Sequence, residues 1–361
     1  MTQVSAMSIE KLHAKRIALF CLTPGGKALA EKIRPLLPMR CYTAEKLLSK
    51  GFEPFTNGFA ATLQQAFTEN DALIVIGATG ITVRVLAPVI QDKMSDPAVI
   101  VMDEKGRFVI SLLSGHLGGA NELTNWLAEK ISGQAVITTA TDVNQVTSFD
   151  LLARDMDATF TDFRSSVKML NQMMVSGKRI GIWWHPDMAT ELDKYAIQGL
   201  ILVTDLQSLP HLDALVCVSY RSEEIRVPVP VYQLIPRRII AGIGCRKATD
   251  TNEVLRLFAE QLARNNLLPE SVRAIGSITL KEQEPALLAL ATHYQVPFTV
   301  FSAKELAPVA ARFPESDFVK KTTGIGSISR PVAWLMSKGH LIGQTYKAQG
   351  ITITLGVETV C

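Results

Sequence analysis

The sequence of 361 residues has no long hydrophobic run. A membrane-spanning helix needs about 18 consecutive apolar residues. The longest apolar run, Ala72–Val83, contains two glycines and is followed by Arg84. The polar N-terminal residues also hold no apolar segment typical of a secretory signal peptide. We therefore expect a protein of the cytoplasm, with neither a membrane anchor nor a signal peptide.

Cysteine pairs and metal-binding motifs are missing as well. The five cysteines are widely spaced, no CxxC pair occurs, and the six histidines are scattered. This spacing disfavours a disulfide framework or a zinc site and fits a reducing compartment. The net charge of +3 is too small to indicate nucleic-acid binding. We expect no resident metal and no nucleic-acid partner.

The residues that are present indicate an α/β protein. Hydrophobic residues make up 47% of the chain and charged residues 20%, as in ordinary globular proteins. Over residues 1–142, buried strands are predicted at Arg16–Leu22 and Asp71–Gly77, each followed by a helix. In Ala98–Leu113, two β-rich runs flank a short turn at Gly106, which favours a hairpin. We predict an N-terminal three-layer α/β domain with a mixed sheet.

This domain is predicted to end with a helix and a strand. In Ala120–Ile131, apolar residues recur at helical spacing on one face. The stretch Ala135–Asp142 that follows is predicted as a strand ending in hydroxyl side chains and a carboxylate.

Two further regions complete the predicted organisation. Residues 143–226 form a small, variable middle α/β region, with a helical stretch near Leu151–Met174 and two strands. Residues 227–238 contain several prolines, which favours an extended linker. Residues 239–361 alternate strand and helix and end in a hairpin at His340–Val357, so we predict a C-terminal three-layer α/β domain.

Loops that follow strands are where open α/β sheets bind ligands, and one such loop is rich in polar residues. Its candidate residues are Ser114, His116, Gly118, Gly119, Asn121 and Glu122. In one interpretation the glycines allow close packing and His116 is structural. In the other, His116 is an acid–base group whose polar neighbours orient it or bind substrate. The residues by themselves leave both interpretations open.

Two other strand ends in the N-terminal domain carry candidates for binding. Gly77 and Gly80 precede a helix with Arg84, where backbone N–H groups and the guanidinium could hold a carboxylate. Thr139 and Asp142 offer a hydroxyl and a carboxylate after the last predicted strand. Either stretch could equally be a polar turn.

The C-terminal domain has a weaker signal. The stretch "GIGCRKATD" contains a GxG without the third glycine of a dinucleotide loop, which makes it a weak match. Gly244, Arg246 and Lys247 lie there at a helix start that suits an anionic group. Lys281 and Glu284 follow the next strand and are further candidates.

Several of these stretches together resemble one family. "GATGITVRVLAP", "DKMSDPAVIVMDEKGRFVISLLSGHLGGANEL" and "VITTATDVN" are similar to the N-terminal domain of the cobalt-precorrin-5A hydrolases, the CbiG family of anaerobic cobalamin (vitamin B12) biosynthesis. "GIGCRKAT", "SITLKEQEPALLALA" and "FSAKELAPV" resemble its C-terminal domain, which is related to CobE, a stand-alone protein of the aerobic pathway. The resemblance covers essentially the whole chain, with a variable middle region.

The resemblance implies a hydrolase of corrinoid and porphyrin metabolism. Such an enzyme opens the δ-lactone of a ring-contracted cobalt-tetrapyrrole and releases acetaldehyde, giving cobalt-precorrin-5B. Because cobalt enters as part of the substrate, no cofactor is implied.

The roles that we assign within this family remain hypotheses. We expect His116 to be the general base for water, with Glu122 orienting it. Ser114 or the N–H groups of Gly118 and Gly119 would receive the oxyanion. The remaining candidates would bind the substrate, with carboxylate side chains of the macrocycle held by Arg84, Arg246 and Lys247.

Two other classes of function stay open. A non-catalytic tetrapyrrole carrier would use the same basic loops and pass its cargo to neighbouring pathway methyltransferases. A nucleotide-dependent enzyme is disfavoured because no complete GxGxxG or Walker motif is present. No membrane partner is expected, and the oligomeric state, a homodimer included, is left open.

Overall fold

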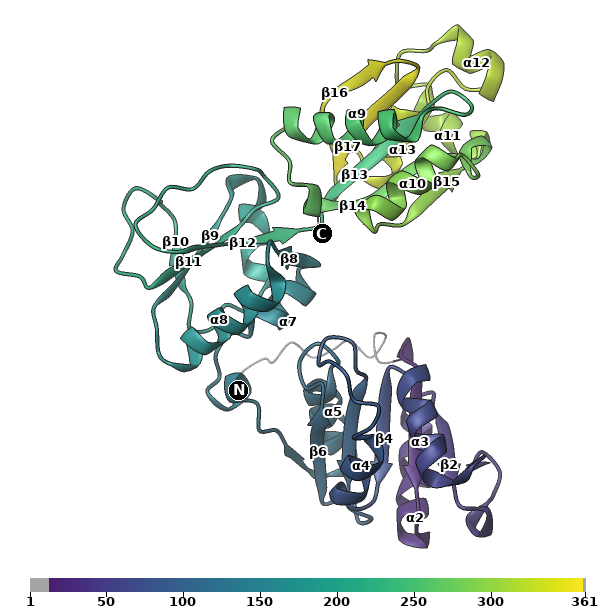
Figure 1. Ribbon diagram of the computed structural model, residues 1–361, viewed down its shortest axis with the longest axis vertical. Coiled ribbons are helices and arrows are strands. Elements are labelled where there is room, and N and C mark those ends of the chain that lie inside the picture. Colours follow the sequence, from purple (N-terminus) through teal and green to yellow (C-terminus); the bar gives the residue numbers. More distant parts are fainter. Residues whose placement is uncertain (1–12, 360–361) are drawn as a thin grey trace. The chain divides into compact units, whose positions relative to one another are not determined.

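The computed structural model describes residues 13–359, without the side chain of residue 318. The chain forms two compact units, Met1–Leu151 and Leu152–Cys361. Each unit is described by itself below (Figure 1). Among the described helices, none has the length and apolar character needed to span a membrane.

Unit 1 contains a seven-stranded mixed sheet. Its strands are β1 (Ile17–Cys21), β2 (Arg40–Thr43), β3 (Glu53–Pro54), β4 (Ala72–Ile76), β5 (Ala98–Met102), β6 (Phe108–Leu113) and β7 (Gln134–Val136), in the order β3-β2-β1-β4-β5-β6-β7. All neighbouring pairs are parallel except β5 and β6. The antiparallel pair follows from a hairpin in which Gly106 has φ 68°, as the sequence predicts.

Helices cover both faces of this sheet. The helices that pack on it are α2 (Pro24–Ile33), α3 (Gly58–Glu69), α4 (Thr79–Leu86) and α5 (Ala120–Ile131). The short helices α6 (Ala140–Val143) and α7 (Phe149–Asp155) follow β7, and α7 continues into unit 2. Alternate strand residues face opposite sides. Thus Leu19 and Ile74 pack with α2 and α5, whereas Phe20 and Val75 pack with α3 and α4. The predicted three-layer domain is confirmed.

The end of unit 1 differs from the sequence prediction. The predicted strand over Ala135–Asp142 is only partly correct, because β7 ends at Val136. Residues 140–143 form the short helix α6, whose preceding residue Thr139 accepts the N–H of Val143 through its carbonyl. This turn carries Asp142 in the first turn of α6 instead of at a strand end.

Unit 2 begins with a five-stranded middle sheet. Its strands are β8 (Ala158–Phe160), β9 (Ile180–Trp184), β10 (Ile201–Val203), β11 (Ala214–Val218) and β12 (Val231–Pro236), in the order β10-β9-β11-β12-β8. The helical stretch predicted near Leu151–Met174 is interrupted by β8 and continues as α8 (Phe163–Val175). The linker predicted at 227–238 is wrong, because β12 pairs with β11 inside this sheet. Its prolines fit because extended backbone is what a strand requires.

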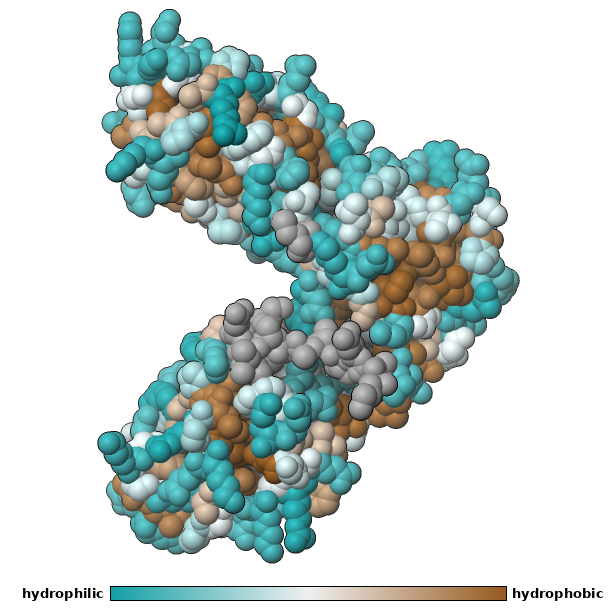
Figure 2. Space-filling model, turned by 180° about the vertical axis from the view of Figure 1, so that it is seen from behind, coloured by the Kyte–Doolittle hydropathy of each residue, from teal (hydrophilic) through white to brown (hydrophobic). Residues whose placement is uncertain are grey.

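Apolar side chains cover one side of the middle sheet. Val203, Leu212, Leu215 and Cys217 are buried beneath partly exposed apolar side chains from strands and connecting loops. These covering residues are Trp183, Ile201, Leu206, Leu209, Ile225, Val227 and Val229. Figure 2 shows an apolar area at the surface of this part of the chain.

The rest of unit 2 is an α/β domain built on a second five-stranded sheet. Its strands are β13 (Ile239–Gly244), β14 (Val272–Ile278), β15 (Phe298–Phe301), β16 (Leu341–Ala348) and β17 (Ile351–Val357), in the order β15-β14-β13-β17-β16. Its helices are α9 (Thr251–Arg264), α10 (Pro285–Tyr294), α11 (Ala303–Ala310), α12 (Asp317–Thr323) and α13 (Ser329–Met336). Short 3₁₀ helices lie in unit 1 at Arg34–Leu36 and Glu45–Leu47, and in unit 2 at Pro186–Lys194, Pro269–Ser271 and Thr279–Lys281. The predicted closing hairpin is confirmed by the antiparallel pair β16 and β17.

Candidate functional site

The polar loop after β6 is a tight turn into α5. Ser114 has φ 56° and Gly119 has φ 85°, so two residues of the turn adopt left-handed backbone. The N–H of Ala120 donates to the carbonyl of Ser114, and the N–H of Asn121 donates to that of Gly115. A side chain at 118 would not fit, because a Cβ there would lie 2.5 Å from the Cβ of Ser114. This compact turn projects His116 away from the strand.

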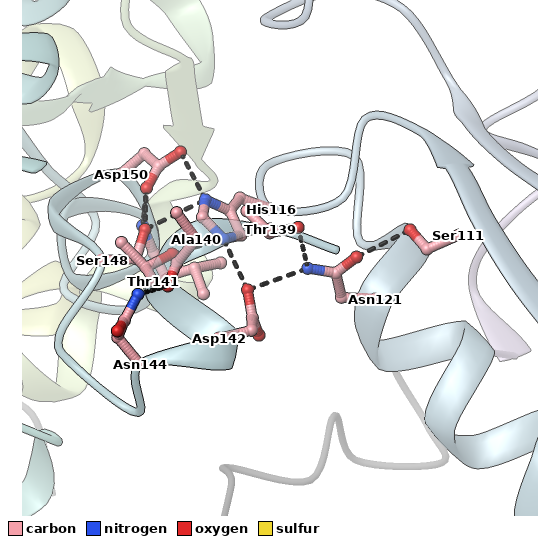
Figure 3. A network of polar contacts seen from close by, with 11 residues as sticks. Ser111, His116, Asn121, Thr139, Ala140, Thr141, Asp142, Asn144, Ser148 and Asp150 are labelled. Atoms are coloured by element: carbon pink, nitrogen blue, oxygen red, sulfur yellow. Dashed lines mark hydrogen bonds and ion pairs between the residues drawn. The ribbon is translucent and has the colours of Figure 1, made fainter. Parts of the chain in front are cut away.

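His116 lies between two carboxylates (Figure 3). Its Nε2 is 2.9 Å from Oδ2 of Asp142, and its Nδ1 is 3.1 Å from Oδ2 of Asp150. A hydroxyl also reaches each nitrogen at 3.1 Å, Thr141 at Nε2 and Ser148 at Nδ1. Only 11% of the imidazole is exposed. The ring is therefore held in one orientation from both sides.

The two carboxylates determine the charge of His116. Burial lowers the pKa of the imidazole, but the hydrogen bonds and charges of Asp142 and Asp150 outweigh burial and raise the pKa to about 9. For the Asp150 carboxyl, burial acts to raise the pKa. The contacts with His116 and Ser148 outweigh burial and hold this pKa well below its usual range. At neutral pH the ring is therefore an imidazolium that donates from both nitrogens. An imidazolium cannot accept a proton, so these contacts do not favour His116 as the general base.

A second chain of hydrogen bonds fixes Asp142 from the other side. The hydroxyl of Ser111 donates to Oδ1 of Asn121 at 2.6 Å. The Nδ2 of Asn121 then donates to Thr139 Oγ1 and to Asp142 Oδ2, each at 3.0 Å. Figure 3 shows Asn121, on α5, between Ser111 of β6 on one side and Thr139 and Asp142 on the other. The structure thus brings together four of the predicted residues, His116, Asn121, Thr139 and Asp142.

Two contributors to this site were not predicted from the sequence. Asp150 and Ser148 lie 34 and 32 residues beyond His116, around the start of α7. The available signal was the stretch "SFD", a hydroxyl and a carboxylate at a helix start. Such stretches are common helix caps, so only the contact with His116 shows what Asp150 does.

The remaining predicted residues of this loop have mixed outcomes. Oγ of Ser114 is buried and has no hydrogen-bond partner among the described residues. The N–H of Gly119 is occupied because it donates to the carbonyl of His116 at 2.9 Å, so Gly119 does not supply a free oxyanion donor. Glu122 lies in the first turn of α5. Since Asp142 and Asp150 are the carboxylates that orient His116, the orienting role of Glu122 stays a prediction.

Gly77, Gly80 and Arg84 are not brought together with His116. They follow the carboxyl end of β4, next to the carboxyl end of its parallel neighbour β5. Because β6 runs antiparallel to β5, the end of β6 that leads to His116 lies beside the start of β5. The two groups are separated by the length of a strand, about 15 Å. Arg84 is exposed, and its Nη1 donates to the carbonyl of Gly80.

The C-terminal candidates form a separate group in unit 2. Gly244, Arg246 and Lys247 follow β13, and Lys281 and Glu284 follow the parallel strand β14, so both sets lie at one edge of that sheet. Arg246 and Lys247 are exposed. Lys281 pairs with Glu284 at 2.8 Å, and the second oxygen of this buried carboxylate has no hydrogen-bond partner among the described residues.

The "GIG" stretch has a packing role that weakens the nucleotide interpretation. A Cβ at Gly242 would lie 2.1 Å from the carbonyl oxygen of Ser329 and 2.7 Å from the N of Ala333. The glycine therefore lets α13 pack directly on β13. Gly242 lies inside the strand β13, so it does not form a phosphate-binding turn.

No resident metal site emerges in the part of the chain that the structure describes, since no group of His, Cys, Asp and Glu there could hold an ion. The two carboxylates at His116 lie on opposite ring nitrogens, so the three groups do not face one point. A buried histidine held by carboxylates on an α/β domain defines a candidate acid–base enzyme.

Comparison with known proteins identifies the family. The family models for the cobalamin synthesis G N-terminal domain, the cobalamin biosynthesis central region and the cobalamin synthesis G C-terminus match residues 61–142, 147–236 and 239–356. The chain therefore belongs to the cobalamin synthesis G family, whose three domains these models describe. The central model spans the middle sheet and the C-terminal model spans the last sheet, whereas the N-terminal model covers β4 to β7 of the first sheet.

Three curated relatives are similar to this chain. The cobalt-precorrin-5A hydrolase of Salmonella typhimurium is 54% identical over 94% of this chain and 97% of its own length. The cobalt-precorrin-5A hydrolase of Priestia megaterium is 31% identical over 86% of this chain and 84% of its own. Protein CobE of Sinorhizobium sp is 31% identical over 26% of this chain and 62% of its own length.

Proposed function

We propose that this chain hydrolyses cobalt-precorrin-5A. The observation that carries the proposal is the 54% identity with a cobalt-precorrin-5A hydrolase over nearly the whole of both chains. The buried histidine–carboxylate site supports it, because lactone hydrolysis requires acid–base chemistry. We further propose a cytoplasmic enzyme without a resident cofactor, in which cobalt arrives with the substrate.

The proposed reaction has two stages. Water adds to the lactone carbonyl, and the ring C–O bond breaks to give a carboxylic acid and a hydroxyl group. The hydroxyl then loses its proton, the adjacent C–C bond breaks, and its electron pair moves into the tetrapyrrole. Acetaldehyde leaves and the tetrapyrrole takes up a proton, giving cobalt-precorrin-5B. Water is the only co-reactant.

The site around His116 fits these stages. It holds an imidazolium and two carboxylates in fixed positions, so protons can be taken up and returned without side-chain rearrangement. Ser114 remains a proposed oxyanion donor, since its hydroxyl has no partner among the described residues. We propose that basic residues elsewhere, Arg84, Arg246 and Lys247 among them, bind carboxylates of the macrocycle.

The test is acetaldehyde release from cobalt-precorrin-5A by the purified chain. Acetaldehyde is measured by NADH oxidation with alcohol dehydrogenase, and the tetrapyrrole product by mass spectrometry. We expect His116→Gln to lower kcat by about 100-fold or more, because it removes the charge that organises the site. Glu129→Gln, on the exposed end of α5, is the matched control and should retain activity.

The carrier interpretation predicts another result. A carrier binds the macrocycle and changes its absorption spectrum, yet releases no acetaldehyde at any enzyme concentration. That outcome with the unmodified chain would contradict the proposed function.

A further inference from the structure

We propose that Asp142 is the residue that accepts the proton in this site, and that it does so through Oδ1. This inference rests on the proposed function. Oδ2 of Asp142 receives two hydrogen bonds, from Asn121 Nδ2 and from His116 Nε2. Among the described residues, none donates a hydrogen bond to Oδ1 of Asp142, and 30% of this side chain is exposed. One oxygen is thus held by two hydrogen bonds, and the other has no donor among the described residues.

The direction of the hydrogen bond from Asn121 is fixed by its own partners. The hydroxyl of Ser111 lies 2.6 Å from Oδ1 of Asn121, and this amide oxygen can only accept. The amide nitrogen must therefore point at Asp142 and donate. Asn121 is a positioning residue because it holds Asp142 Oδ2 in place while leaving Oδ1 uncovered.

The other two titratable groups of the cluster are less suited to take a proton. Asp150 is only 7% exposed, and its carboxylate accepts from His116, Ser148 and the N–H of Leu151. Each ring nitrogen of His116 already faces a carboxylate, and these carboxylates raise the pKa of the imidazole to about 9. Of the three groups, only Asp142 combines a partly exposed side chain with an oxygen that no described donor occupies.

Other charged groups lie on the elements packed around this cluster. Lys15, just before β1, donates through Nζ to the carbonyl of Gly118 at 2.7 Å, and Glu122 lies in the first turn of α5. Both belong to the same edge of the sheet as His116. Variants at position 142 therefore test Asp142 itself, because they leave these two groups unchanged.

One carboxylate can serve both stages of the reaction. Asp142 Oδ1 takes a proton from water as the water oxygen bonds to the lactone carbonyl. It returns that proton to the oxygen released when the C–O bond breaks, and so becomes a carboxylate again. In the second stage it takes the proton of the new hydroxyl as the C–C bond breaks and acetaldehyde forms. Asp142 then gives up this proton as the tetrapyrrole takes one up, so the carboxylate is restored and no net proton is gained or lost in this stage.

The decisive variant is Asp142→Asn. An asparagine at 142 can keep its amide oxygen at the position of Oδ2, where it accepts from Asn121 and His116. The amide NH₂ then occupies the position of Oδ1 and cannot accept a proton. We expect kcat for acetaldehyde release to fall by about 100-fold or more, with KM changed by less than about 3-fold.

Chemical rescue and a matched control separate proton transfer from structure. Asp142→Ala should recover activity in formate, a small carboxylate that can occupy the vacated space, which a purely structural role would not allow. Asp103→Asn makes the same substitution at the turn after β5, at the opposite sheet edge, and should remain active.

The outcomes distinguish the inference from the function. If the unmodified chain releases acetaldehyde and Asp142→Asn stays within about 5-fold of it, the inference is overturned and the function stands. A rise in KM with unchanged kcat, or a lack of formate rescue, also overturns it. If the unmodified chain releases none, the proposed function fails and the role of Asp142 in it fails as well.

Discussion

The charge cluster at His116 makes a definite prediction about the stability of unit 1. Asp150→Asn keeps the shape of the side chain but removes one of the two negative charges beside the imidazolium. The pKa of His116 is about 9 in the folded chain and its ordinary value is 6.5. At about 1.4 kcal/mol per pH unit, this difference corresponds to about 3 kcal/mol of folding free energy.

The sign follows from which state binds the proton more tightly. Because the folded state holds the proton of His116 more strongly, its contribution is complete below pH 6.5 and is lost as the pH rises through about 9. The pKa of Asp150 is lowered, so its contribution is present above its ordinary value of 3.8. The two effects describe one interaction, which is therefore strongest between about pH 5 and pH 6.5. Asp150→Asn should cost about 2 kcal/mol there, with Asp142 still present, and much less at pH 10.

The assay needs a probe confined to unit 1. Cys21 and Cys41 are 0% and 2% exposed in β1 and β2 and react only when this unit opens. Urea unfolding from pH 6 to pH 10 can be followed by a brief pulse of methyl methanethiosulfonate, with labelling of each cysteine read by peptide mass spectrometry. If the gap between the unmodified chain and Asp150→Asn stays constant across this range, the assignment of the raised His116 pKa to the carboxylates is wrong.

Two other predictions test packing in each unit. Gly118→Ala should destabilise unit 1 by about 2 kcal/mol or more, because the new Cβ would lie 2.5 Å from the Cβ of Ser114. Pulse labelling of Cys21 measures this loss of stability. Unchanged labelling would contradict the geometry of the turn. Arg238→Met should destabilise the middle sheet by about 3 kcal/mol, because it leaves the buried Glu191, now 3.0 Å from the guanidinium, without its partner. Urea unfolding read through the pulse labelling of Cys217 measures this cost, and a variant as stable as the unmodified chain would refute it.

Much of the fold could be predicted from local patterns. The sequence predicts the hairpin at Gly106 because a left-handed turn between two β-rich runs needs glycine. The sequence predicts the helix Ala120–Ile131 because apolar residues recur there at helical spacing. The predicted bounds agree with those of α5. The prolines at 227–238 do not distinguish a linker from a strand, because both have extended backbone and only the pairing with β11 decides between them.

The sequence by itself determined the chemical inventory of the site: a histidine among glycines, an asparagine, and the carboxylate of Asp142 after the next strand. Only the tertiary structure decided how these groups are used. The antiparallel pairing of β5 and β6 places His116 at the edge opposite Gly77, and the start of α7 brings Asp150 to its second nitrogen. The physical reason is that the charge of His116 and the free oxygen of Asp142 depend on distances of about 3 Å between residues far apart in the chain.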